Sequence, residues 1–309
     1  MVKPTPFKIA VPEEQLSWIT DRVKTTRLPP GKELPVDKQW SFGLPIEVAT
    51  HLKNYWTDQF DWRKVEAQLN CEMDMFTLPI SHNDEDLTIH FVHHLSPSDD
   101  ALPLIFIHGW PGNFTEVRYI IDELTKPSSP DAQAYHVVAP SLPGYGFSSY
   151  PKKPFGVIEM AATLNKLMLA LGYNQYIAQG GDWGSLLARV MALEHEKQCI
   201  GIHINMIFSL PPSALWAPFA FGRLVFGYLT GFWSEYEAKN LKRMKWWMDE
   251  ENGYRQIQGT KPQTISYALT DSPFGMMCWL RDKMQHLIDD DFVWKDEEVI
   301  TWAMASQQT

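Results

Sequence analysis

Apolar residues recur with different spacings along the chain, and the changes of spacing divide it into three zones. Residues 1–75 show the three- and four-residue spacing of amphipathic helices. Residues 76–208 alternate short apolar runs with helical stretches, and residues 209–309 are rich in aromatic residues, helical in pattern and without a convincing strand. The pattern therefore predicts a helical N-terminal region, an α/β core and a helical lid.

The first zone contains two clear helix signals. One helix should begin at residues 12–14 and end before the Pro29-Pro30-Gly31 turn, because proline and glycine stop helices there. A second should begin after Asp61 in "DWRKVEAQLN", with the aspartate as its N-terminal cap. Both have one apolar face, which must pack against another part of the fold.

The second zone predicts a mostly parallel sheet. Its expected strands are "LTIHFVHH", "LPLIFIHG", "YHVVAPS", "YIAQGGD" and "IGIHINMIF", nearly continuous apolar runs typical of strands covered on both faces. Binding sites in such sheets lie at the carboxyl ends of the strands. Three strands end there in unusual turns, "HGWPG" (108–112), "PSLPGYGFSS" (140–149) and "GGDWGS" (180–185).

Composition and charge exclude several classes of protein. The 309 residues, 45% hydrophobic and 21% charged, are typical of a globular chain rather than a disordered one. A net charge of −10 with scattered basic residues argues against nucleic acid or anionic lipid as partners. The three cysteines are far apart, and on a strand His93 would point away from His90 and His94, so we expect no metal and no cofactor.

The distribution of apolar runs also bears on location. The N-terminal residues include no run long enough for a signal peptide or anchor, which favours the cytoplasm. The apolar segment 213–233 approaches the length of a membrane span, but Arg223 lies at its centre and Pro218 and Gly222 interrupt it. We therefore expect lid helices here and no transmembrane anchor.

The sequence "GGDWGS" carries the strongest chemical signal. It matches the G-x-S-x-G turn that presents a nucleophile between a strand and a helix, with Gly180 and Gly184 in the flanking positions and Asp182 in place of the serine. A carboxylate is ionised at neutral pH and needs no base to activate it. The alternative is a structural aspartate that caps the following helix.

At this point the chain resembles the microsomal-type epoxide hydrolases, a family with the α/β-hydrolase fold and a helical N-terminal region. The resemblance runs from residue 5 to about residue 304 and includes "PFKIAVPEE", "FVHHLS", "IHGWPG", "APSLPGYGFSS", "GGDWGS" and "GYRQIQGTKPQT". It implies a reaction with a small apolar epoxide and a helical lid over the site. It implies no cofactor.

The resemblance also implies roles for individual residues. Asp182 would open the epoxide and form an alkyl ester, and the backbone N–H groups of Trp110 and Trp183 would hold the oxyanion when water attacks the ester. Tyr254 would protonate the opening ring, since a tyrosine with a pKa of about 10 carries a proton at pH 7. A lid tyrosine with only a structural role is the alternative, and His108 is expected only to brace its loop.

One part of the family pattern is missing from the 309 residues. The family has a second lid tyrosine and, near the chain's end, a histidine oriented by an acid, whereas this sequence stops at "ASQQT" and its last histidine, His286, falls in the lid zone. We therefore expect a C-terminally truncated chain without the final strands, able to form the ester but not to cleave it. The exposed edge of "IGIHINMIF" would then favour self-association.

Two other functions remain open from the sequence. Haloalkane dehalogenases also place an aspartate followed by a tryptophan at the elbow, although the N-terminal helical region and Tyr254 argue against this class. The third possibility is a degenerate homologue without catalytic activity that binds apolar ligands.

Overall fold

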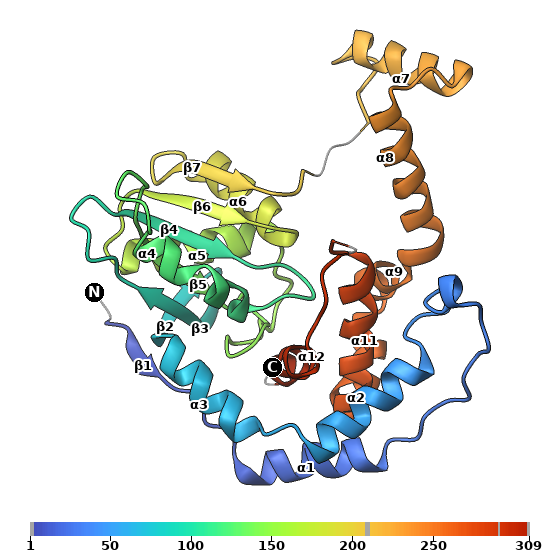
Figure 1. The fold of residues 1–309 in the computed structure, drawn as a ribbon. Helices are drawn as coiled ribbons and strands as arrows, with labels where there is room; N and C mark the ends of the chain where they lie inside the picture. Colours follow the sequence, from blue (N-terminus) through green and yellow to red (C-terminus); the bar gives the residue numbers. More distant parts are fainter. Residues whose placement is uncertain (1–2, 208–210, 290, 308–309) are drawn as a thin grey trace. The chain divides into compact units, whose positions relative to one another are not determined.

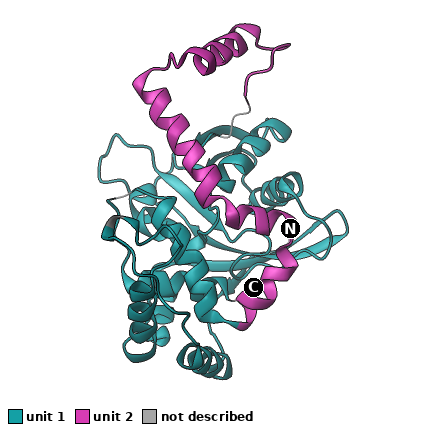
Figure 2. Ribbon diagram, turned by 90° about the vertical axis from the view of Figure 1, so that its right-hand side faces the viewer, with its two compact units in different colours: residues 1–207, 272–309 teal, residues 208–271 magenta. Residues whose placement is uncertain are grey.

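The computed structural model describes residues 3–207, 211–289 and 291–307, and these form two compact units (Figure 1). Unit 1 comprises residues 1–207 and 272–309, and unit 2 comprises residues 208–271 (Figure 2). The zone 209–309, expected to form one lid, is thus divided at Ser272, and its C-terminal helices belong to unit 1.

Unit 1 is built around a seven-stranded sheet with the strand order β1-β2-β3-β5-β4-β6-β7. The pairs β5–β4, β4–β6 and β6–β7 are parallel, whereas β1–β2, β2–β3 and β3–β5 are antiparallel, so the sheet is mixed. The strands are Thr5–Phe7 (β1), Met75–His82 (β2), Glu85–His94 (β3), Leu102–Ile107 (β4), Tyr135–Pro140 (β5), Tyr176–Gly180 (β6) and Cys199–Ile204 (β7).

All five strands predicted from apolar runs are present, as β3 to β7, although β7 ends at Ile204 and the last residue of its predicted run, Phe208, lies outside the described residues. The sequence did not reveal β1 and β2. Pro79 interrupts the strand signal of β2, but it lies beyond the residues that pair with β1, at a free edge where proline is tolerated. The turn from β2 to β3 uses Asn83 and Asp84, both with positive φ, as expected for a tight hairpin.

Helices cover the sheet on both faces. On β5, Val137 and Ala139 belong to one apolar core while Val138 belongs to the other, as the alternation of side chains along a strand requires. The first core includes residues of the N-terminal and C-terminal helices, and the second includes residues of α5 and α6. The helices of unit 1 are Glu13–Thr25 (α1), Ile46–Asp58 (α2), Trp62–Glu72 (α3), Ile121–Thr125 (α4), Val157–Ala170 (α5), Trp183–Glu194 (α6), Pro273–His286 (α11) and Asp296–Ser306 (α12), with short helical turns at Val36–Lys38 (η1) and Phe114–Tyr119 (η2).

The two N-terminal helix predictions are confirmed. Helix α1 ends at Thr25, before the predicted proline–glycine stop, and buries Ile19 and Val23. Helix α3 is capped by Asp61, whose carboxylate accepts a hydrogen bond of 3.2 Å from the backbone N–H of Lys64. Its apolar face, Trp62, Val65 and Leu69, is buried as the spacing predicted.

Unit 2 is helical in its described part. It contains Pro218–Thr230 (α7), Glu235–Trp246 (α8), a π-helical turn at Trp247–Glu251 (η3), Gly253–Thr260 (α9) and Pro262–Asp271 (α10). Arg223, in the middle of the apolar helix α7, forms an ion pair of 2.6 Å with Glu237 of α8. Among the described residues, no helix has both the length and the apolar character needed to cross a membrane.

The sheet has an apolar edge at β7. Within the described part of the chain β7 pairs only with β6, and Ile200 and Ile202 are exposed, with relative exposures of 53% and 40%. An apolar strand edge with unpaired backbone groups is a template for pairing with another chain.

We predict that the purified 309-residue chain self-associates through β7. Ile202→Lys should shift sedimentation toward monomer, because a charged side chain on an edge strand opposes pairing. Ile158→Lys, at an exposed isoleucine of α5, is the control and should leave association unchanged. A wild-type chain that sediments as a monomer at every concentration would contradict this prediction.

Candidate active site

Asp182 lies at a sharp turn between a strand and a helix. Strand β6 ends at Gly180 and α6 begins at Trp183, and Asp182 has φ 48° and ψ −123°. A positive φ is uncommon for a residue with a side chain and marks local backbone strain, which clusters at functional sites. The strained turn projects Asp182 from the carboxyl end of the sheet.

The flanking glycines are required by close backbone approach. A Cβ atom on Gly180 would lie 2.1 Å from the carbonyl oxygen of Gly184, and one on Gly184 would lie 2.0 Å from the carbonyl oxygen of Ile107. The start of α6 therefore sits directly against the end of β4. This contact brings the turn at Asp182 beside the loop 108–112 that follows β4.

Two backbone N–H groups point at the carboxylate of Asp182. The N–H of Trp110 donates a hydrogen bond of 2.8 Å to Oδ1, and the adjacent N–H of Trp183 also favours the ionised carboxylate by lowering its pKa. Burial raises the pKa of Asp182 and these two hydrogen bonds lower it, with a net rise above its ordinary value. Gly109 makes the contact possible, since a Cβ there would lie 2.4 Å from Oδ1.

His108 braces the loop on which Trp110 lies. Its Nδ1 is 3.0 Å from the carbonyl oxygen of Gly109, and its Nε2 accepts a hydrogen bond of 3.1 Å from the backbone N–H of Leu142. Burial lowers the pKa of His108 to about 4, so the ring is neutral at pH 7 with both nitrogens engaged. The ring ties the loop after β4 to the loop after β5.

The three histidines of β3 have separate partners. His90 Nδ1 lies 2.9 Å from the Ser141 hydroxyl, His93 Nε2 lies 2.8 Å from the Tyr173 hydroxyl, and His94 Nε2 accepts from the backbone N–H of Asp74. No cluster of three or more potential metal ligands occurs in the part of the chain that the structure describes.

A second carboxyl group, Glu116, lies beside Asp182. It is the third residue of the short helix η2, and its carboxylate accepts from the backbone N–H of Asn113. Burial and the negative charge of Asp182 raise the pKa of Glu116 to about 7. Sequence reasoning missed this residue, because the only local signal, Asn113 followed three positions later by glutamate, indicates a helix cap.

Tyr254 belongs to the other unit. It lies in the first turn of α9, directly after the π-helical turn η3, and is half-buried. Unit 1 alone thus brings together Asp182, Trp110 and Trp183 but does not include Tyr254.

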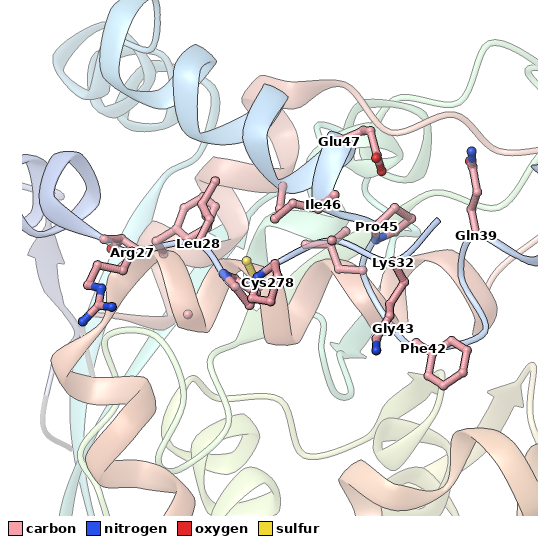
Figure 3. Close-up of a pocket in the computed structure, with 18 of the residues that line it drawn as sticks. Arg27, Leu28, Lys32, Gln39, Phe42, Gly43, Pro45, Ile46, Glu47 and Cys278 are labelled. Carbon is pink, nitrogen blue, oxygen red and sulfur yellow. The ribbon is translucent and has the colours of Figure 1, made fainter. Parts of the chain in front are cut away.

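A pocket of about 800 Å³ opens elsewhere in unit 1. It lies between the segment 26–49, which joins α1 to α2 and includes the first turn of α2, and the start of α11. Figure 3 shows the Cys278 side chain together with Leu28 and Ile46 in its lining. None of the predicted catalytic residues lines it.

The sheet and its elbow define the class of protein. A parallel set of strands ending in a strained turn, with an acidic side chain facing two backbone N–H groups, is an α/β-hydrolase fold with aspartate in the nucleophile position. Residues 4–117 match the family described as "Epoxide hydrolase N terminus", and residues 103–254 match "alpha/beta hydrolase fold". The chain belongs to the epoxide hydrolase family.

Individual relatives agree with this assignment. The chain is 35% identical to epoxide hydrolase 1 of Sus scrofa over 93% of its own length and 63% of the relative's, and 34% identical to juvenile hormone epoxide hydrolase 2 of Ctenocephalides felis over 90% and 59%. An epoxide hydrolase mutant from Aspergillus niger superposes with a TM-score of 0.84 at 31% identity, covering 100% of this chain and 75% of that one. The chain thus spans about six tenths of the length of these curated relatives.

We predict that Gly184→Ala destabilises the chain by about 1–3 kcal/mol, the usual cost of overpacking a tight contact. The added methyl would collide with the carbonyl oxygen of Ile107. Gly201→Ala is the matched control, because the nearest atom to its Cβ is 3.8 Å away. Urea unfolding of both variants checks this, and equal midpoints would refute it.

We predict that Glu116→Gln stabilises the chain more at pH 8 than at pH 5. The folded-state pKa of Glu116, about 7, lies above the ordinary carboxyl value, so its contribution to stability is full at low pH and is lost as the pH rises through 7. Glutamine does not titrate. Thermal unfolding of wild type and variant from pH 5 to pH 8 makes the measurement. A difference in stability between variant and wild type that becomes smaller as the pH rises would contradict the prediction.

Proposed function

We propose that this chain acts on epoxides through an alkyl ester of Asp182. The main support is the hydrogen bond of 2.8 Å that the Trp110 N–H donates to Asp182 Oδ1, at a strained turn flanked by two glycines. Membership in the epoxide hydrolase family supports the same reaction. A carboxylate suits the attack because it forms a bond to an alkyl carbon without prior loss of a proton.

In the first half of the proposed reaction, a carboxylate oxygen of Asp182 bonds to an epoxide carbon and the ring C–O bond breaks. The ring oxygen takes a proton, and we assign this donation to Tyr254, whose match to the family sequence "GYRQIQGTKPQT" supports the role. The product of this half is a hydroxyalkyl ester of Asp182.

In the second half, water attacks the carbonyl carbon of the ester and a negative charge develops on its oxygen. The N–H groups of Trp110 and Trp183 already face the carboxylate and are the proposed donors to that charge. One such donor is worth about 2.7–4 kcal/mol in other enzymes. Because Gly109 permits the close approach, the loop needs no rearrangement to provide the hydrogen bond.

We infer a small apolar epoxide as the substrate and the cytoplasm as the location. Relatives include a juvenile hormone epoxide hydrolase, and the aromatic residues of the proposed lid favour an apolar ligand. The free thiol of Cys71, which is exposed, suits a reducing compartment.

We predict that incubation with a reactive aryl epoxide adds one epoxide mass to the chain, at Asp182. Asp182→Asn should abolish the adduct, because the amide oxygen is a far weaker nucleophile than a carboxylate. Intact-mass and peptide mass spectrometry make the measurement. The control is Glu159→Gln, which removes a carboxylate in helix α5 that is not part of the elbow. This variant should still form the adduct.

The same protein should release no halide from a haloalkane. Halide release without epoxide modification would favour the dehalogenase alternative, and the absence of both would favour a non-catalytic protein that binds apolar ligands.

A further inference from the structure

Two carboxyl side chains pack against the loop 108–112, one beside Gly109 and the other beside Gly112. Asp182 fills the space beside Gly109, where an added Cβ would lie 2.4 Å from its Oδ1. Glu116 fills the space beside Gly112, where an added Cβ would lie 1.6 Å from its Oε1 and 3.4 Å from the carbonyl oxygen of Gly109. Each glycine of "HGWPG" thus leaves room for one carboxyl group, and the loop holds the two groups close together.

The charges around this pair are few. Besides Asp182 and Glu116, the titratable groups on the neighbouring loops are His108 and Tyr145, whose rings lie 5.3 Å apart. The helix η2 itself also carries Arg118, which forms an ion pair of 3.2 Å with Glu72, and Tyr119, whose hydroxyl donates to Glu298. Burial lowers the pKa of His108 to about 4, and burial together with Asp182 raises that of Tyr145 to about 12, so both are neutral at pH 7. No cation on these loops offsets a second negative charge beside Asp182, and like charges at short range disfavour joint ionisation.

We propose that Glu116 is a second working carboxyl of this site, which holds a proton while Asp182 is ionised and releases it when Asp182 becomes an ester. The inference rests on the proposed function, since it requires the ester. Esterification removes the negative charge of Asp182, and the electrostatic cost of ionising Glu116 falls with it. The burial of the side chain and the hydrogen bond from Asn113 remain unchanged.

The carboxylate of Glu116 then becomes the proton acceptor for ester cleavage. Water forms a bond from its oxygen to Cγ of Asp182, and one of its protons passes to Glu116. The bond from Cγ to the alkyl oxygen breaks, and that oxygen leaves as an alcohol with the second proton of the added water. The proton that Glu116 released on esterification passes through solvent to the Tyr254 phenolate that ring opening left. Asp182 is again a carboxylate, and Glu116 and Tyr254 are again neutral, so atoms and charge balance and the resting state returns.

A purely structural role for Glu116 makes a different prediction. As the third residue of η2 it accepts from the N–H of Asn113, which is what a helix-capping glutamate does. Glu159 is a matched comparison, because it is also the third residue of its helix, α5, and its Oε2 accepts from the N–H of Gly156 at 2.9 Å. Capping alone would give neither glutamate a part in cleaving the ester.

The first experiment titrates the side-chain carboxyls of the resting 309-residue chain by carbon-13 NMR. We expect one carboxyl to titrate near pH 7, to vanish in Glu116→Gln, to persist in Glu159→Gln and to move to lower pH in Asp182→Asn. A Glu116 that is ionised below pH 5, or whose titration does not move in Asp182→Asn, overturns the proposal. This measurement uses no substrate, so it decides the coupling even if the epoxide reaction fails.

The second experiment follows the lifetime of the aryl epoxide adduct by intact mass after excess epoxide is removed. Glu116→Gln should prolong it at least about 100-fold, the low side of what a positioned base contributes. Glu116→Asp should restore part of the rate, and Glu159→Gln should match wild type. Equal lifetimes in wild type and Glu116→Gln overturn the hydrolytic role, whereas no adduct in any variant overturns the proposed function itself.

Discussion

The hydrogen bond between the Trp110 N–H and Asp182 Oδ1 is the contact around which the site is built. It depends on the pairing of β4 with β6, in which Ile107 is opposite Gly180, so that the residues after each strand meet. Glycines at 109, 180 and 184 then remove the side chains that would keep the two turns apart. The sequence motifs on both strands follow from a single requirement, a backbone N–H within hydrogen-bonding distance of a carboxylate.

The spacing of apolar residues and the residue types at turns predicted the core strands and the elbow at Asp182. Continuous apolar runs identified β3 to β7, and the residue types around Asp182 identified the elbow. The short strand β1 and the proline-containing β2 gave too weak a signal. The division at Ser272 could not be read from helical spacing, because spacing shows that α11 has an apolar face but not that Leu280 and Met284 pack in the same core as Ile19.

Glu116 illustrates what sequence reasoning cannot reach. Its neighbours in the chain indicate a helix cap, and Asn113 does cap η2, because its side chain accepts a hydrogen bond from the N–H of Thr115. The raised pKa of Glu116 comes instead from burial and from Asp182, a residue distant in sequence that the sheet brings close. Tyr254 is the opposite case, since its proposed role comes from family resemblance and not from a contact within unit 1.

The bond from Trp110 also makes the two oxygens of Asp182 different before any substrate binds. Oδ1, held by the N–H, is placed to become the carbonyl oxygen of the ester, which leaves Oδ2 to form the bond to the alkyl carbon. Under the proposed chemistry the Oδ2 atom bridges to carbon, while water adds a new oxygen at Cγ. The carboxylate that emerges from each cycle therefore carries an oxygen from the solvent, so the protein's own side chain would keep an isotopic record of its turnover.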